Sequence, residues 1–202
     1  MPISIVVGAA DWLHLEALER YPSMKIALSE GGIGWIPYFL ERSDFSHERH
    51  KAWTHSRFEG TKPSEVFRRH FLTCFIDDAF GLQNLQAVGE DMVAYECDYP
   101  HSDSLWPNAP ETLFESLKHL TEQQIEKVTH RNAMSFFNFN PLKHHKREEL
   151  TVGALRARAA ADKVDVTPRS FGGAAPLAKG VEPRPITSGD VIDQFSRHRK
   201  IA

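Results

Sequence analysis

Three short apolar runs, separated by stretches with helical spacing, organise the first part of the chain. The runs are Lys25–Ser29, Leu72–Ile76 and Met92–Cys97. Apolar residues recur at helical intervals around these runs, and the predicted helices are Leu13–Arg20, Ile33–Thr54, Pro63–Arg69, one capped at Asp77 or Asp78 and running to Val88, Glu111–Leu120, and Glu122–Phe137 with a break near Asn132. Strands that alternate with helices are typical of parallel sheets with right-handed crossovers. The pattern predicts an α/β fold with three parallel strands neighbouring in chain order and helices on one outer side.

The composition changes near residue 145. Aromatic residues, including all four Trp, are frequent up to His145, whereas Gly, Pro and Ala accumulate afterwards. We predict one domain over residues 1–145 and a C-terminal extension over residues 146–202, which begins with a helix at Arg147–Lys163 and continues as a Gly/Pro-rich arm. A charge run at Lys143–Arg147 marks the hinge between them, although a solvated helix surface is the more ordinary interpretation of such a run.

Composition and charge exclude several classes of protein. A chain of 202 residues with 41% hydrophobic and 25% charged residues fits one soluble globular domain. The net charge of −3 argues against a nucleic-acid partner, and no apolar run approaches the roughly 20 residues that span a bilayer. The first ten residues lack the positive charge of a secretory signal. Cys74 and Cys97 lie in strand-like runs, where we expect buried thiols, and two cysteines fit a reducing compartment. We therefore predict a cytoplasmic protein.

Polar or glycine residues follow each predicted strand, at the end where parallel sheets and barrels place their sites. Glu30, Asp77 and Asp98 are the acidic residues at these three positions. After the third strand, Asp98, His101 and Asp103 lie within six residues, and such oxygen and nitrogen ligands can hold a divalent metal. The alternative is that Asp98 caps a turn while His101 and Asp103 face water.

Two further motifs indicate a ligand less strongly. Glu30–Trp35 has the sequence Glu-Gly-Gly-Ile-Gly-Trp, and Pro37 stands where a dinucleotide fingerprint needs its third glycine. The interpretations left open are a helix start whose free N–H groups meet an anion, or a tight strand-to-helix turn. His47 and His50 lie three residues apart, not at the spacing of a zincin motif, and their charged neighbours favour a solvated helix face.

Four stretches together resemble the amidohydrolase-related family of metal-dependent hydrolases and decarboxylases, the group that includes aminocarboxymuconate-semialdehyde decarboxylase. The matching stretches are Leu18–Pro37, Cys74–Asp78, Glu96–Ser104 and Lys127–Ala133. The resemblance covers about Asp11 to Phe139, and the combination of stretches is more specific than any one of them. The family fold is a (β/α)₈ barrel, so the resemblance implies that the three apolar runs are barrel strands six, seven and eight. It therefore predicts a partial TIM barrel followed by the C-terminal helical and loop extension.

The resemblance also implies roles for three residues at the strand ends. Asp98 corresponds to the strand-eight aspartate that ligates the catalytic metal, commonly zinc. Glu30 stands where many members carry a histidine next to the metal-bound water, and a carboxylate there could take a proton from that water if its pKa suits the task. His101 follows the matched aspartate and could face the substrate. We therefore expect a metal ligand in Asp98 and catalytic residues in Glu30 and His101.

Other features of the family are missing from this sequence. The family draws further ligands from a His-x-His pair on strand one and a histidine on strand five, and this chain contains no His-x-His. A whole barrel typically takes about 250 residues, whereas about 140 precede the tail. We therefore expect this chain to be the C-terminal part of an enzyme. That enzyme would hydrolyse or non-oxidatively decarboxylate a small carboxylated or cyclic substrate. The alternative is a non-catalytic partial barrel that works only by association with another chain, through self-association or a complementing N-terminal chain.

Overall fold

The computed structural model describes residues 2–55, 58, 60–101, 103–167, 180 and 189. Residues 1–168 form one compact unit and residues 169–202 form a second. The helices are α1 (Pro2–His14), α2 (Ala17–Arg20), α3 (Ile36–Thr54), α4 (Pro63–His70), α5 (Ala79–Gln83), α6 (Leu85–Val88), α7 (Ala109–Leu117), α8 (Glu122–Glu126), α9 (Asn132–Phe136) and α10 (Val152–Ala161). Three short 3₁₀ helices are η1 (Glu90–Met92), η3 (Pro141–Lys143) and η4 (Arg147–Leu150), and η2 (Lys127–Arg131) is a π-helix. Over the described residues, no helix combines the length and apolarity that crossing a bilayer requires.

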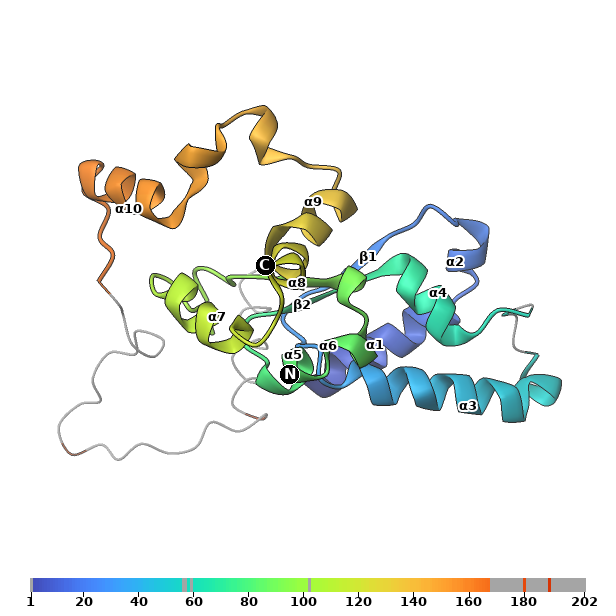
Figure 1. The fold of residues 1–202 in the computed structure, drawn as a ribbon. Helices are drawn as coiled ribbons and strands as arrows, with labels where there is room; N and C mark the ends of the chain where they lie inside the picture. The colour runs from blue at the N-terminus through green and yellow to red at the C-terminus, as the bar shows by residue number, and fades with distance from the viewer. Residues whose placement is uncertain are drawn as a thin grey trace, which may run out of the picture. The chain divides into compact units, whose positions relative to one another are not determined.

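Three short strands form a parallel sheet within the first unit (Figure 1). The strands are β1 (Ile26–Leu28), β2 (Phe71–Phe75) and β3 (Val93–Tyr95), in the spatial order β1-β2-β3. Leu28 of β1 and Val93 of β3 both lie opposite Thr73 of β2 in the register. Helices join each strand to the next and give the chain the length that a parallel crossover needs. The predicted strands and their parallel order are confirmed.

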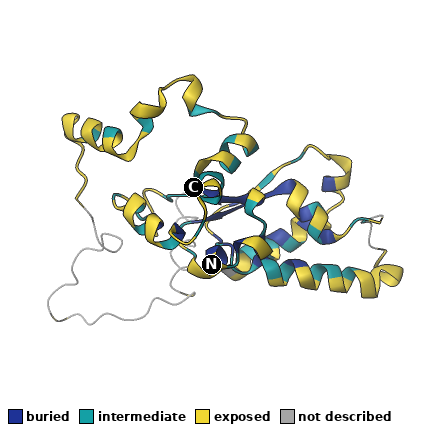
Figure 2. Cartoon of the chain, in the orientation of Figure 1, coloured by how far each residue is buried: buried dark blue, intermediate teal, exposed yellow. Residues whose placement is uncertain are grey.

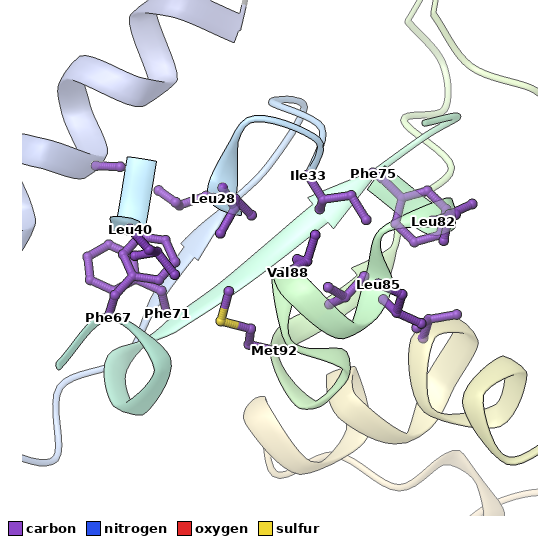
Figure 3. Packing of buried hydrophobic residues seen from close by; sticks show 14 of the residues in the cluster. Leu28, Ile33, Leu40, Phe67, Phe71, Phe75, Leu82, Leu85, Val88 and Met92 are labelled. Carbon is purple, nitrogen blue, oxygen red and sulfur yellow. The ribbon is translucent and has the colours of Figure 1, made fainter. Parts of the chain in front are cut away.

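The main core lies between one face of this sheet and helices that include α1, α3, α4, α5 and α6. Figure 3 shows Leu28, Phe71 and Phe75 of the strands packed among apolar side chains of these helices. Phe67 of α4 is fully buried, and its ring stacks on that of Phe71 with 4.3 Å between the ring centroids. This packing fixes the sheet, so the residues that follow each strand start from defined positions.

A smaller apolar cluster covers the other face of the sheet. Leu72, Cys74 and Ala94 alternate with the core-facing strand residues and therefore point the opposite way. Ala133 and Phe136 of α9 pack against them. In Figure 1, α9 lies above the strands, while α1, α5 and α6 lie below them. Ile125 of α8 packs against the main core. The expectation of helices on one side only is thus wrong for α9, which packs against the other face of the sheet.

The N-terminal helix α1 is absent from the sequence prediction, which considered the first ten residues only as a possible secretory signal. Ala9 and Leu13 of α1 are buried in the main core, whereas Ile3 and Val7 are exposed. Because apolar residues occupy both its buried and its exposed sides, α1 lacks the polar stripe that makes a surface helix recognisable in a sequence.

The segment predicted as one helix over Glu122–Phe137 forms α8, η2 and α9 in succession. The predicted break near Asn132 corresponds to the π turn that ends just before this residue. The side-chain amide of Asn132 donates to the carbonyl oxygens of Glu90 at 2.7 Å and of Val93 at 2.8 Å. The widened turn is therefore held directly to the start of β3.

The helix predicted over Arg147–Lys163 is present as η4 followed by α10, and most of α10 is exposed (Figure 2). Thr151 separates the two and caps α10, because its Oγ1 accepts a hydrogen bond from the N–H of Ala154 at 3.3 Å. Arg156 of α10 forms an ion pair with Glu111 of α7, with Nη1 and Oε1 2.6 Å apart. The first unit thus includes residues 146–167. Their assignment to a separate extension remains a prediction, and the Gly/Pro-rich arm lies outside the described residues apart from positions 180 and 189.

The two cysteines differ in exposure. Cys74 of β2 is buried, and mainly this burial raises its pKa to about 12. Cys97 is only half-buried, which corrects the expectation that both thiols are buried. Because the thiolate is the reactive form, Cys74 should react slowly with thiol reagents in the native chain.

We expect Ellman's reagent to modify one thiol rapidly in the native chain and both after denaturation in guanidinium. A Cys97→Ser variant is the matched control and should lose the rapid phase. Rapid modification of Cys74 in the native chain, located by peptide mapping, would contradict the expectation.

Candidate metal centre at the strand ends

Glu30, Asp98 and His101 converge at the carboxyl ends of the two outer strands. Glu30 comes two residues after the end of β1, and Asp98 comes three residues after the end of β3. One potential ligand atom from each residue lies within 4.8 Å of the other two. In the part of the chain that the structure describes, no other group of three His, Cys, Asp or Glu side chains is spaced in this way. The structure thus brings together the three predicted site residues, and their roles remain predictions.

Asp98 and His101 form a tight local pair. Asp98 has a φ of 54°, in the left-handed region that Asp enters more readily than most residues. Its main-chain oxygen accepts the N–H of His101 at 2.8 Å, and its Oδ1 lies 2.7 Å from Nδ1 of His101. The Asp98 side chain is 8% exposed and the His101 side chain 67%. The hydrogen bond to Asp98, followed by the charge of Asp98, raises the pKa of His101 above its usual value.

Glu30 faces this pair from the end of β1. Its φ of 61° is also left-handed, which is uncommon for Glu and persists only where the surroundings determine the conformation. Its Oε1 lies 3.9 Å from Nδ1 of His101, and its side chain is 56% exposed. A carboxylate that is open to water and lies beside an imidazole can accept or return a proton during a reaction.

Glu96 is a residue of this site that the sequence analysis missed. Its carboxylate accepts a hydrogen bond from the main-chain N–H of Glu30. Burial is the main cause that raises the pKa of Glu96, and the charges of Glu30 and Asp98 raise it further. The signal in the sequence was a carboxylate at the end of an apolar run, two residues before Asp98 and on the same side of the extended chain.

The glycine-rich turn after Glu30 is closed by a carboxylate of the chain itself. Oδ2 of Asp78 accepts the N–H of Ile33 at 2.7 Å and that of Gly34 at 2.8 Å. At Gly32, where φ is 64°, a Cβ atom would come within 2.9 Å of the same Oδ2. The alternative of free N–H groups that meet an external anion is therefore wrong, and the tight strand-to-helix turn is confirmed.

Asp77, the third strand-end acid, lies outside the triad. It is exposed, and its Oδ1 accepts a hydrogen bond from Oγ of Ser116 at 2.9 Å. The strand-end segments 29–35, 76–81 and 95–107 contain neither Lys nor Arg, and their acidic residues are Glu30, Asp77, Asp78, Glu96, Asp98 and Asp103. Such an excess of negative charge attracts cations to this edge of the sheet.

The three converging side chains fit the ligand preferences of a divalent metal. Two carboxylates and one imidazole supply oxygen and nitrogen donors, both of which zinc binds, and a catalytic zinc site has three protein ligands and one open position. Asp98 is held in place by its turn and is nearly buried, whereas Glu30 and His101 are open to solvent. The donor set leaves room for water or a substrate beside an ion.

The histidine pair of α3 lies apart from this centre. His47 is half-buried, with its ring centroid 5.2 Å from that of Phe58, and His50 is exposed with its ring 5.3 Å from that of Trp53. Neither belongs to a group of three potential ligands within the described residues. The expected solvated helix face is confirmed for His50, which is exposed, whereas His47 is half-buried.

The chain is similar to a known protein family and to solved structures of known proteins. A protein-family model described as amidohydrolase matches residues 2–139. An amidohydrolase from Mycobacterium avium subsp. paratuberculosis K-10 is similar in structure, with a TM-score of 0.53 and 21% identity, over 63% of this chain and 32% of that one. The 5-carboxyvanillate decarboxylase from Sphingomonas paucimobilis gives a TM-score of 0.54 and 26% identity, over 66% of this chain and 39% of that one. No curated protein matches the sequence.

These likenesses show an α/β fold with a small parallel sheet. The chain spans 32% and 39% of the lengths of the two solved structures. The likeness to the mycobacterial protein is a likeness of fold alone, because the two sequences are 21% identical. A closed eight-stranded barrel therefore remains a proposal for the protein as a whole.

Proposed function

This chain belongs to the amidohydrolase family, and we propose that it supplies barrel strands six to eight of a metal-dependent hydrolase or non-oxidative decarboxylase. The substrate would be a small carboxylated or cyclic molecule. The observation that supports this best is the convergence of Glu30, Asp98 and His101 at the carboxyl edge of a parallel sheet. Family membership and the likeness to a decarboxylase support the two types of reaction.

Each residue of the triad has a chemical task in this proposal. Asp98, Glu30 and His101 would hold a divalent ion, with zinc the first candidate from the resemblance. A divalent ion at such a site supplies Lewis acidity and makes water a stronger nucleophile at neutral pH. Asp98 also orients the imidazole of His101 through their 2.7 Å contact. One oxygen of the exposed Glu30 carboxylate would bind the ion, and the other would take a proton from water or return one to the substrate.

The isolated chain is expected to be a poor enzyme. The chain contains no His-x-His pair, and Asp98 alone corresponds to the ligand set of the family resemblance. Losing even the partners that orient metal ligands typically costs about 10–100-fold in affinity or activity, so losing several ligands should cost more. We expect purified residues 1–202 to carry well under one zinc per chain by mass spectrometry. Turnover against a panel of aromatic and aliphatic carboxylates should be negligible.

Tight zinc binding together with turnover would contradict the expectation of a poor enzyme. A soluble monomer that retains one zinc through dialysis and turns over a panel substrate would contain a complete site. Loss of both properties on replacing Asp98 would assign that site to the triad. The expectation of an incomplete site would then be wrong, while the proposed reaction class would be supported.

A second candidate function is a non-catalytic partial barrel that works only in association with another chain. Within the described residues, β1 and β3 each pair only with β2, so each has one unpaired edge. Ala27, in the middle of β1, is exposed. Unpaired strand edges favour association with another chain. Sedimentation velocity at several concentrations should reveal self-association. An assembly without metal or turnover would favour this function over the enzymatic one.

A further inference from the structure

Glu96 extends the sheet by one residue beyond β3. Its main-chain N–H donates to the carbonyl oxygen of Phe75 at 3.0 Å, which continues the ladder between β2 and β3 past Tyr95. Side chains alternate between the two faces of a strand. Glu96 therefore shares the face of Ala94, the face opposite to the main core.

From this face the Glu96 side chain reaches across the middle strand. The carboxylate lies beside the residue that follows β1, on the far side of β2 from its own strand. The same carboxylate accepts the main-chain N–H of Glu30, which follows β1. One side chain thus joins the ends of the two outer strands.

We propose that Glu96 is a positioning residue, which holds the main chain of Glu30 in its left-handed conformation and so directs the Glu30 carboxylate toward Asp98 and His101. A left-handed conformation costs free energy for Glu, so it persists only where contacts hold it. The hydrogen bond from the N–H of Glu30 to Glu96 is such a contact. Glu30 and Asp98 follow strands that are separated by β2. The convergence of the triad therefore depends on the direction in which Glu30 leaves the sheet.

The first test uses the metal-free full chain and does not depend on the proposed function. Amide exchange of the Glu30 N–H is measured by NMR in Glu96→Ala, Glu96→Gln and the control Glu115→Ala, an exposed carboxylate paired with Lys118. We expect exchange to be at least about tenfold faster in Glu96→Ala, because the N–H loses its acceptor. Glu96→Gln keeps an acceptor oxygen and should stay within about threefold of the parent chain, as should the control.

The buried amide of Thr73 in the middle strand serves as the internal reference. Unchanged exchange of the Glu30 N–H in Glu96→Ala would overturn the proposal. Equal acceleration at Thr73 would also overturn it, because the substitution would then loosen the whole sheet rather than release one residue.

The second test rests on the proposed function and uses Co²⁺ as the probe of the triad. Glu96→Ala should weaken Co²⁺ binding about 10–100-fold, as expected for a residue that orients a ligand. In a Glu30→Gln background, adding Glu96→Ala should change the affinity by less than about threefold, because Glu96 acts through Glu30. An equal loss in both backgrounds would make Glu96 a ligand itself and overturn the positioning role. If the parent chain and Asp98→Asn bind Co²⁺ alike, the proposed function fails, while amide exchange at Glu30 still decides the role of Glu96.

Discussion

Replacing Asp78 with alanine is expected to lower the free energy of unfolding by about 3 kcal/mol. Its carboxylate accepts three main-chain N–H groups: those of Ile33 and Gly34 at Oδ2, and that of Gly81 at Oδ1, all at 2.7–2.8 Å. Hydrogen bonds to a charged group contribute about 1.5–3 kcal/mol each. The sum is reduced because Asp78 is only half-buried and water can replace part of what is lost. Urea unfolding, followed by circular dichroism, measures the change.

Asp77→Ala is the matched control, because it removes the neighbouring carboxylate. Asp77 is exposed and accepts a side-chain hydrogen bond from Ser116, so its loss should cost less than about 1 kcal/mol. Asp78→Asn keeps the shape of the side chain but turns an NH₂ group toward N–H donors, and its stability should fall between those of the other two variants. Equal stability of the two alanine variants would show that the glycine turn does not depend on Asp78.

The main elements of the fold could be predicted because their signals are local. The apolar runs around Ile26, Thr73 and Val93 are short, end at turn residues and alternate with helical spacing, which together imply parallel strands. The helix start after Asp78 was also visible, because Asp is a favoured N-cap residue. What could not be predicted is the second use of Asp78, which closes a turn 44 residues away. A hydrogen bond over that separation leaves no periodic pattern in the sequence.

The candidate site shows the same division between local and distant information. Asp98 and His101 are three residues apart and follow a strand, so their proximity could be expected from the sequence. Glu30 could be placed on the same edge only because parallel strands share their carboxyl ends. Glu96 was missed because its importance comes from Glu30, 66 residues away in the chain. The pairing register of the strands, which sequence spacing does not determine, brings these two residues together.

Replacing Asp98 with asparagine is expected to weaken Co²⁺ binding by about 100-fold or more, since removing a direct ligand should exceed the 10–100-fold cost of removing an orienting partner. Asparagine is preferred to alanine because φ at this position is 54°, a conformation that Asn tolerates. The substitution therefore removes the negative charge without adding backbone strain. Of the three donor side chains, that of Asp98 is the least exposed, so water cannot easily replace it.

The pH dependence of binding gives this prediction a second readout. Asp98 raises the pKa of His101 above its usual value, and a protonated imidazole cannot bind a metal. Co²⁺ affinity of the parent chain should therefore increase as the pH rises through this elevated pKa. In Asp98→Asn, the pKa of His101, followed by NMR, should fall toward its usual value, and any residual pH dependence should move to lower pH.

Asp77→Asn, at the neighbouring strand end but outside the triad, should bind Co²⁺ within about threefold of the parent chain. If both asparagine variants bound Co²⁺ equally well, the negative charge of this edge would attract the ion without a specific site, and Asp98 would not be its ligand.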